Sequence, residues 1–378
     1  MRVLLAGYGN TGRAIDALIV SYPAMSVSSV HICDKKIHGI TAQEWLRDRH
    51  QLVDVVINLT GESPWELLSL CERYRLDYID SAIDMPENAV RNVETCYQAL
   101  RSRSHDNRIL VGFGMNPGLV EYIYHTAKPD TLHTAIELEY DTAWRPQPGV
   151  FSTWSPQAYF YEAIAFAPYY YTRKSQHAFC HPPAIELDTH LSLDSVARRF
   201  NVLPHAEVVS MGKSSALCEA CAFLYQPPVT MQEFMKANWS RLDATSVQDI
   251  PTPGDGLQGC DTVGMLIHTG ASRTPYFYNS ASHALCSHRF KDRYDRGVNG
   301  TCWQVACGLC VALQLLSHLR PGAYNMTDVA ASWSRQIRRV LIDIGFAIER
   351  RDYDVDELPW RNIASVLGLS SAQKEAVL

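Results

Sequence analysis

The start of the chain carries the pattern that most limits its fold: an apolar run, a glycine-rich turn and an amphipathic helix in immediate succession. Arg2 to Ala6 is the apolar run, and Gly7-Tyr8-Gly9-Asn10-Thr11-Gly12 is the turn. In a dinucleotide-binding turn of this spacing, the first glycine permits the tight bend. The second lets the backbone approach a pyrophosphate, and the third allows close helix–strand packing. The helix N-terminus offers unpaired N–H groups to the phosphates. We therefore predict cofactor contacts at Gly7, Gly9, Asn10, Thr11 and Gly12.

Alternating strand and helix patterns continue this unit to about residue 118. Strands are predicted at 30–34, 53–59, 77–80 and 109–113, and helices at 64–73 and 89–101. This rhythm predicts an α/β protein with an N-terminal Rossmann domain, a doubly wound parallel sheet, over residues 1–118. Ligands of such sheets bind beyond the carboxyl ends of the strands. The segments to consider there are 82–84, 114–118 and the turn at Thr60, which we assign to the cofactor.

Asp34 ends the second predicted strand, about twenty residues beyond Gly12. A carboxylate at this place accepts hydrogen bonds from the adenosine ribose hydroxyls and repels a 2′-phosphate, which favours NAD over NADP. Lys35 and Lys36 follow directly and weaken that preference. The alternative is that Asp34 is only a solvated turn residue at the end of a strand.

Length and composition restrict the remaining possibilities. A chain of 378 residues exceeds one ordinary domain. Its formal net charge of −6 argues against a nucleic-acid-binding protein, which needs a basic face. No apolar run reaches the ~20 residues that span a bilayer, and no signal-peptide pattern precedes the first strand. We therefore expect a cytoplasmic enzyme with neither a membrane nor a nucleic-acid partner.

Cysteine spacing raises the question of a metal site. The eleven cysteines are expected to be thiols in a reducing compartment. Cys218 with Cys221 and Cys307 with Cys310 have the CxxC spacing that on loops suggests zinc or redox chemistry. Both pairs lie in apolar stretches that look helical, and free cysteine is commonly a small buried hydrophobe. We therefore assign them to packing and predict no metal site, with zinc ligation as the alternative.

The regular alternation is lost from about Leu119, which predicts a second, α+β domain over residues 119–298 for substrate binding and dimerisation. Ala135 to Tyr140 alternates as a strand does. The segment from Phe151 to Tyr171 is dense in aromatic residues.

Residues 299–378 carry two helix patterns. Gln304 to Leu316 is apolar, and Val329 to Ile344 is an amphipathic helix candidate. By analogy with two-domain dehydrogenases, a helix near 300–320 is expected to return to the Rossmann sheet and complete it.

Several short segments follow one another in a recognisable order along the chain. They are Tyr78-Ile79-Asp80-Ser81-Ala82-Ile83-Asp84, Gly114-Met115-Asn116-Pro117-Gly118-Leu119-Val120, Glu139-Tyr140-Asp141-Thr142, Thr153-Trp154-Ser155, Glu162, His205-Ala206-Glu207 and Asn299-Gly300-Thr301-Cys302-Trp303-Gln304-Val305. In these segments and in their order, the chain resembles bacterial homospermidine synthase, within the wider saccharopine-dehydrogenase-like group. The resemblance extends from the first glycine turn to about Leu316.

The resemblance implies a redox-neutral coupling of amines by a homodimer that holds NAD. In that reaction NAD takes a hydride from putrescine to give an imine, ammonia is exchanged for a second diamine, and the new imine receives the same hydride. The resemblance implies catalytic roles for Asn116, Trp154, Glu162 and His205. It implies substrate contacts for Asp84, Glu139 and Glu207, with Asp84 and Asn116 also near the cofactor.

These residue types suit amine chemistry in their own right. Carboxylates hold the cationic ends of a diamine, and a Trp face attracts an ammonium or iminium. A free alkyl amine resembles Lys, with a pKa of about 10. Some group must therefore take its proton before a hydride leaves, and His205, or a carboxylate of raised pKa, is suited to this. The alternatives from residue type alone are a core Trp154, solvated Glu139, Glu162 and Glu207, and a loop histidine at 205.

Departures from the family pattern keep other functions open. Asp84 stands where the family has Glu, and the aromatic stretch Ala163 to Tyr171 replaces a glycine-containing one. Arg173 and Lys174 follow it and could pair with a substrate carboxylate. That would favour a saccharopine- or opine-type reductase, which consumes NAD(P)H to reduce an imine. A non-catalytic NAD-binding protein is the remaining alternative.

Overall fold

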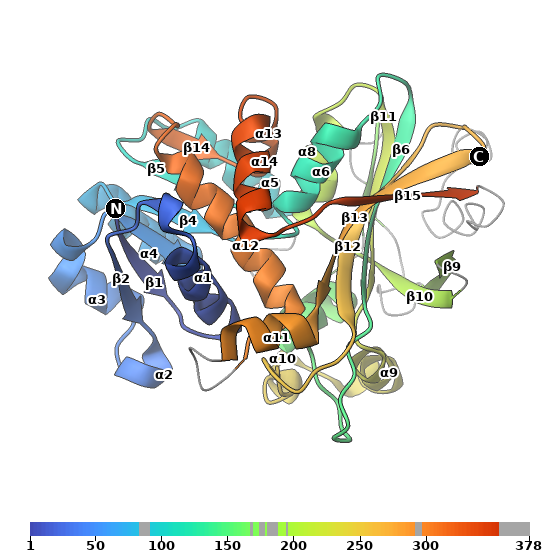
Figure 1. The fold of residues 1–378 in the computed structure, drawn as a ribbon, viewed down its shortest axis with the longest axis horizontal. Coiled ribbons are helices and arrows are strands. Elements are labelled where there is room, and N and C mark those ends of the chain that lie inside the picture. The colour runs from blue at the N-terminus through green and yellow to red at the C-terminus, as the bar shows by residue number, and fades with distance from the viewer. Residues whose placement is uncertain are drawn as a thin grey trace. The chain divides into compact units, whose positions relative to one another are not determined.

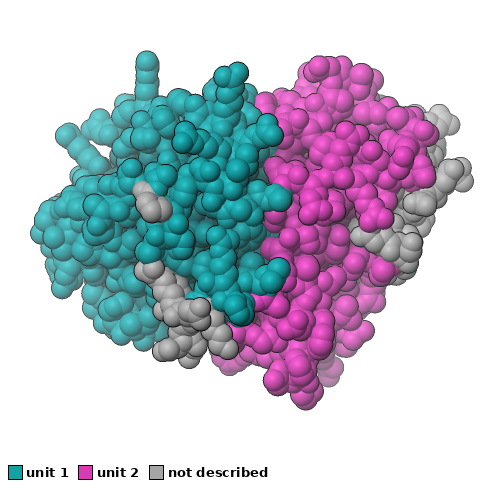
Figure 2. Space-filling model, viewed as in Figure 1, with its two compact units in different colours: residues 1–122, 285–347 teal, residues 123–284, 348–378 magenta. Residues whose placement is uncertain are grey.

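The computed structural model describes residues 1–82, 91–166, 169–173, 178–179, 188–193, 196–291 and 297–354 (Figure 1). They form two compact units, coloured separately in Figure 2. The first unit contains residues 1–122 and 285–347, and the second contains 123–284 and the segment that begins at 348. The sequence placed the boundaries at 118 and 298, with a separate C-terminal part. In the structure that part is divided between the two units.

The first unit is built on a six-stranded sheet in which every neighbouring pair is parallel. In order across the sheet, the strands are β14 (Gly322–Tyr324), β5 (Arg108–Leu110), β4 (Asp77–Asp80), β3 (Val55–Asn58), β1 (Arg2–Ala6) and β2 (Ser29–Cys33). The predicted fold class, with a doubly wound parallel sheet at the N-terminus, is confirmed. The edge strand β14 was not predicted, because three residues are too few to show a periodicity.

Helices flank this sheet. They are α1 (Asn10–Ser21), α2 (Lys35–His38), α3 (Ala42–Arg49), α4 (Pro64–Tyr74), α5 (Arg91–Arg101), α12 (Gly300–Leu316), α13 (Met326–Ala330) and α14 (Ser334–Ile344), with 3-10 turns η1 (Pro23–Met25) and η2 (His50–Leu52). Along the chain, α6 (Leu119–Ala127) and α11 (His283–Lys291) include the unit boundaries. The amphipathic helix expected at 329–344 is present as α14 but begins at Ser334, since a turn separates it from α13.

The apolar helix α12 belongs to the first unit and packs against α1 (Figure 1). A Cβ atom at Gly308 would lie 2.1 Å from the carbonyl oxygen of Gly114 and 2.6 Å from that of Phe113. Only glycine therefore lets α12 come this close to the turn that follows β5. The helix is buried almost all round, which is typical of a helix inside a domain. Among the described helices, none is long and apolar enough to cross a membrane.

The second unit is built on a mixed nine-stranded sheet. Its main path runs β15 (Glu349–Asp354), β13 (Arg273–Ser282), β12 (Cys260–His268), β6 (His133–Asp141), β11 (Cys218–Gln226), β10 (Val196–Leu203) and β9 (Asp188–Leu193), with β7 (Tyr169–Thr172) paired to β11 and to β8 (Ala178–Phe179). Its helices are α7 (Pro156–Phe160), which continues into the π-helical turn η3 (Tyr161–Ala165), α8 (Ala206–Lys213), α9 (Val229–Asn238) and α10 (Ala244–Val247), with a 3-10 turn η5 (Trp239–Arg241). Strands β6 and β11 are parallel, whereas the other pairs are antiparallel. The predicted α+β character is confirmed.

The central strand β6 is buried along its whole length. Ile136, Leu138 and Tyr140 point into an apolar core that includes Leu224 of β11 and Leu266 of β12. The predicted alternation is therefore present, with the glutamates on the opposite face. That face is buried as well, although alternation in such a sheet usually marks a face in contact with water. The sequence does not show that this second face is buried. The carboxyl groups on it are therefore enclosed by the protein rather than exposed to water.

The two CxxC pairs lie in different kinds of element. Cys307 and Cys310 are on α12, as expected, but Cys218 and Cys221 are on β11, so the helical expectation for them was wrong. Pairing with β6 on one side and, at Cys221, with β7 on the other outweighs the helix preference of the local sequence. All four thiols are buried.

The close approach of α12 to the turn after β5 predicts how a substitution of Gly308 changes stability. Gly308→Ala adds a methyl group where two carbonyl oxygens already lie, so we expect the free energy of unfolding to fall by about 1–3 kcal/mol. Helix propensity alone predicts the opposite sign, since Ala is favoured over Gly by about 1 kcal/mol. Thermal and urea unfolding measure the difference, with the exposed α14 variant Gln336→Ala as control. A Gly308→Ala protein as stable as the wild type would contradict this packing.

Candidate active site

The glycine turn after β1 has the geometry that a pyrophosphate requires. Gly7 has φ +100°, and a Cβ there would lie 2.6 Å from the Leu59 carbonyl oxygen. A Cβ at Gly12 would lie 2.7 Å from the Gly7 carbonyl oxygen. These two glycines are needed by the fold itself. A Cβ at Gly9, by contrast, would meet no atom within 4 Å. The space in front of Gly9 is therefore open.

The first turn of α1 is available to an anion. Gly9 is the N-cap, and no side chain caps this end of the helix. Asn10 and Thr11 are the first helical residues, and the Asn10 side chain accepts a hydrogen bond from the Arg13 guanidinium. The turn lies between β1 and β3, where the strand order reverses and ligands of doubly wound sheets bind. These residues fit the dinucleotide predicted from the sequence.

Asp34 follows β2 and holds two backbone amides. Its Oδ2 accepts from the Tyr8 N–H at 2.7 Å and its Oδ1 from the Lys36 N–H at 2.8 Å, which caps α2. The carboxylate therefore ties the end of β2 to the glycine turn. Asp34 is thus a turn residue, as in the alternative interpretation. It also lies at the edge of the sheet where the cofactor is predicted to bind. The preference for NAD over NADP remains a prediction.

The other predicted residues of the first unit lie in turns at strand ends. The Thr60 hydroxyl follows β3 and donates to Asn58 Oδ1 at 2.9 Å. Asn116 is half-buried in the turn after β5, next to a cis peptide bond with Pro117. The Gly114 N–H closes this turn on the Pro117 carbonyl at 2.9 Å. Asp84 lies outside the described residues.

In the second unit, β6 presents a row of carboxyl groups to one face of the sheet. Glu137, Glu139 and Asp141 alternate with the apolar core residues and are at most 5% exposed. In the sheet register, Tyr225 of β11 lies opposite Glu139, and Asp261 of β12 lies opposite Asp141. Residue type alone allows Glu139 to be a solvated side chain. Its burial instead indicates a specific role, because carboxylates are rarely buried without a partner.

His205 lies between two carboxylates. Its Nδ1 is 2.5 Å from Glu207 Oε1, and its Nε2 is 3.6 Å from Glu162 Oε1. Burial disfavours the imidazolium, but the charges and hydrogen bonds of Glu207 and Glu162 outweigh it and raise the His205 pKa well above its ordinary value. Glu207 is in the first turn of α8, where the helix dipole favours a negative charge. Glu162 comes from the π-helical turn η3. Three of the predicted residues thus form one buried chain.

Trp154 is held at the edge of the acidic face. Its indole N–H donates to the Tyr225 hydroxyl at 2.8 Å, and the two rings meet edge to face. The indole is only partly buried, so it is not a plain core residue. Tyr225, which was not predicted, lies between Trp154 and Glu139.

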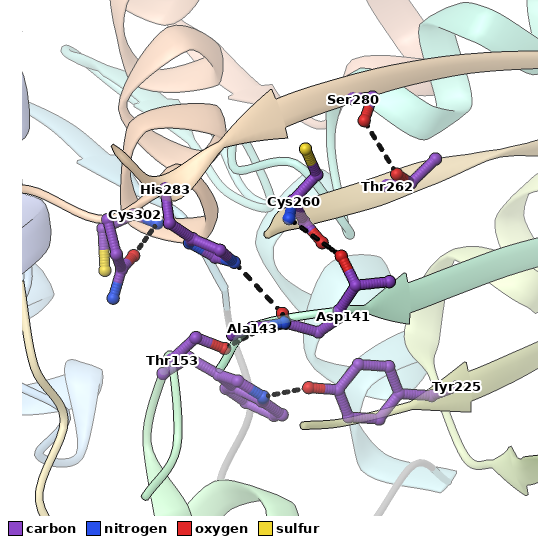
Figure 3. Close-up of polar contacts among 12 residues, drawn as sticks. Asp141, Ala143, Thr153, Tyr225, Cys260, Thr262, Ser280, His283 and Cys302 are labelled. Carbon is purple, nitrogen blue, oxygen red and sulfur yellow. Dashed lines mark hydrogen bonds and ion pairs between the residues drawn. The ribbon is translucent and has the colours of Figure 1, made fainter. Parts of the chain in front are cut away.

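A second buried ion pair supports the same region. His283 Nε2 lies 3.0 Å from Asp141 Oδ1, and both side chains are at most 1% exposed (Figure 3). Asp141 also accepts from the Thr153 hydroxyl at 2.5 Å and from the Ala143 N–H at 2.7 Å (Figure 3). Burial opposes the charge on His283, but Asp141 outweighs it and raises the His283 pKa. Asp141 thereby anchors the residue before Trp154.

Arg173, the cation that favours a reductase with a carboxylate substrate, pairs with another residue of the protein. Arg173 is about half exposed and pairs with Glu219 at 3.6 Å, and it also donates to the Ala216 carbonyl. The Arg173 guanidinium is therefore directed to Glu219 and the Ala216 carbonyl. Lys174 lies outside the described residues.

The comparisons with known proteins support the fold. No family model matches the sequence, and no curated protein is similar to it. A homospermidine synthase from Legionella pneumophila, solved with NAD, has a TM-score of 0.71 at 17% identity and covers 93% of this chain and 91% of its own. A saccharopine dehydrogenase (L-Glu forming) from Saccharomyces cerevisiae has a TM-score of 0.56 at 13% identity and covers 93% of this chain and 99% of its own. The resemblance stated from the sequence is confirmed at the level of the fold.

The open space at Gly9 allows a test of the cofactor site. Gly9→Ala places a methyl group where no protein atom lies, so we expect an unchanged melting temperature. The same methyl group obstructs a pyrophosphate, and NAD affinity should fall about 10- to 100-fold. Isothermal titration calorimetry with NAD measures the affinity. Gly7→Ala is the contrasting variant, since its Cβ meets the Leu59 carbonyl and should destabilise the fold. Unchanged NAD affinity in Gly9→Ala would place the cofactor elsewhere.

The Asp141–His283 pair predicts a pH-dependent stability. Because the folded pKa of His283 is raised, its contribution is complete below the unfolded pKa of ~6.5 and is lost as pH rises through the folded value. Asp141→Asn should lower the free energy of unfolding by about 3–5 kcal/mol at pH 6, because a buried charge loses its partner. The difference in the free energy of unfolding between the wild type and Asp141→Asn should become smaller as pH rises. Urea unfolding between pH 6 and 9 measures this, with Asp54→Asn of the exposed Arg2 pair as control. A difference independent of pH would exclude a charged His283.

Proposed function

We propose that this protein is an NAD-dependent enzyme that couples two amines without net oxidation or reduction, in the manner of homospermidine synthase. The observation that carries the proposal is the buried chain Glu162–His205–Glu207, beside Glu139 and Trp154 in the same unit. A buried set of carboxylates with an aromatic face suits an organic cation. The pairing of Arg173 with Glu219 removes the main argument for a substrate carboxylate.

The residues of the first unit would hold the cofactor. The N-terminus of α1 and the open space at Gly9 would take the pyrophosphate, and Asp34 the adenosine ribose. When bound, NAD supplies a hydride acceptor that can later return the same hydride. Asp34 favours the form without a 2′-phosphate, so we expect NAD rather than NADP.

The residues of the second unit would manage cations and protons. Glu139 and Glu162 would hold the cationic ends of the diamine, and the indole of Trp154 would stabilise an iminium. A carboxylate must take a proton from the reacting ammonium, because only the neutral amine loses a hydride; Glu162 is suited to this. His205, with its raised pKa, begins as an imidazolium and can donate a proton to the departing ammonia.

A reductive coupling of an amine with a keto or aldehyde acid is the second candidate. Its chemistry shares the hydride transfer to an imine, and the fold likeness to saccharopine dehydrogenase keeps it in view. It differs in consuming one NAD(P)H for each product. A homodimer of cytoplasmic location remains part of the proposal, and size-exclusion chromatography with light scattering tests the dimer.

The coupling assay is mass spectrometry of purified protein incubated with NAD and putrescine, with the NADH absorbance followed alongside. We expect homospermidine and ammonia without net NADH. Glu162→Gln should lower kcat about 10²- to 10⁴-fold, while Glu219→Gln, which alters only the partner of Arg173, should leave it unchanged. Net NADH without a coupled amine would contradict redox neutrality. Product formed only from an amine, a keto acid and NAD(P)H would establish the second candidate, and NAD binding without turnover the non-catalytic alternative.

A further inference from the structure

Glu137 is a buried carboxyl group that the proposed reaction does not use. It lies in the middle of β6, between Ile136 and Leu138 of the apolar core, and its side chain is 0% exposed. Neither of its oxygens has a hydrogen-bond donor within the described part of the chain. A buried carboxylate without a donor costs several kcal/mol, so this group must be stabilised in another form.

The groups that face Glu137 are almost all acidic. Glu207 of α8 and its N-cap neighbour His205 act on it, as does Glu139 from the same strand. The buried thiol of Cys221 approaches from β11, against which α8 packs. Glu207 lies close enough for its charge and for hydrogen bonding to raise the pKa of the Glu137 carboxyl group. Two carboxyl groups can make such a bond only when one of them carries a proton.

One oxygen of Glu207 is left for a hydrogen bond from Glu137. Glu207 Oε1 is taken by His205, whereas Glu207 Oε2 is buried and has no donor in the described structure. We propose that Glu137 is a positioning residue that stays protonated and donates its O–H to this second oxygen of Glu207. The role of the resulting chain, Glu137–Glu207–His205–Glu162, in amine chemistry rests on the proposed function; the protonation of Glu137 does not.

The surroundings of the two carboxyl groups determine which of them carries the proton. Burial, and then the charge of Glu207, raise the Glu137 pKa well above its usual range. Glu207 is bonded to His205 and lies in the first turn of α8, where the helix dipole favours a negative charge. Of the two carboxyl groups, Glu137 therefore holds the proton.

This arrangement sets the charge and the geometry of the site. With Glu137 neutral and His205 charged, the four groups carry one net negative charge, which an organic cation can balance. The Glu137 O–H also fixes the rotamer of Glu207. Glu207 in turn fixes the imidazole of His205, so that its Nε2 faces Glu162.

Infrared difference spectroscopy tests the protonation without any need for turnover. The spectrum of the wild type minus that of Glu137→Gln at pH 7 should contain the C=O stretching band of a protonated carboxylic acid. Glu219→Gln, at the partly buried partner of Arg173, should retain that band. If the wild type shows no such band that Glu137→Gln removes, the proposal is wrong, whatever the enzyme's substrate proves to be.

The positioning role is tested with a donor and a non-donor in the same place. Glu137→Gln keeps an N–H for Glu207 and should retain near wild-type kcat and the same His205 titration by ¹⁵N NMR. Glu137→Leu leaves Glu207 Oε2 without a donor and should lower kcat about 5- to 150-fold and shift that titration. NAD affinity and circular dichroism check that both variants fold. Equal damage in the two variants, or none in Glu137→Leu, would overturn the role, whereas no turnover in any of the proteins would count only against the proposed function.

Discussion

The acidic row on β6 lies inside the protein, and many of the polar contacts in the second unit compensate for the free-energy cost of placing it there. Asp141 is satisfied by His283, Thr153 and a backbone amide. Glu207, which faces the same row, has one oxygen bonded to His205 and lies in the first turn of α8. A buried charge that loses its partner is strongly destabilising. The positions of Trp154 and His205 therefore depend on where β6 places its carboxyl groups.

The first unit meets a different requirement, that of close backbone approach. Gly7 and Gly12 bring β1, the Leu59 turn and α1 together, and Gly308 brings α12 onto the turn after β5. In each case a side chain would collide with a carbonyl oxygen. Gly9 is the exception, since the protein itself does not fill the space beside it. That contrast separates the glycines required by folding from the one for which the proposed cofactor is the reason.

How much the sequence could predict depended on the distance over which each interaction acts. The glycine turn and the strand–helix alternation are local, and they predicted the first sheet apart from β14. The ion pair of Asp141 with His283 joins residues far apart along the chain, and nothing near His283 signals it. Glu137 was visible only as a polar residue in an alternating strand, and alternation does not show whether a polar face meets water. The local sequence predicted a helix at Cys218 and Cys221 because local preference does not reveal pairing with the distant strands β6 and β7.

The division of the chain between the two units bears on its synthesis. Most of the second unit is inserted between α6 and α11, and only β15 joins its sheet later, so the segment that supplies α12 and β14 is made after most of that unit. Until residue 324 has left the ribosome, the edge of β5 has no partner, and the face of α1 that receives α12 is uncovered. Unpaired edges and exposed apolar faces are the features that lead nascent chains to aggregate. Most of the second unit is therefore translated before the N-terminal sheet can be completed, so this topology leaves one edge of that sheet and one face of α1 uncovered during synthesis.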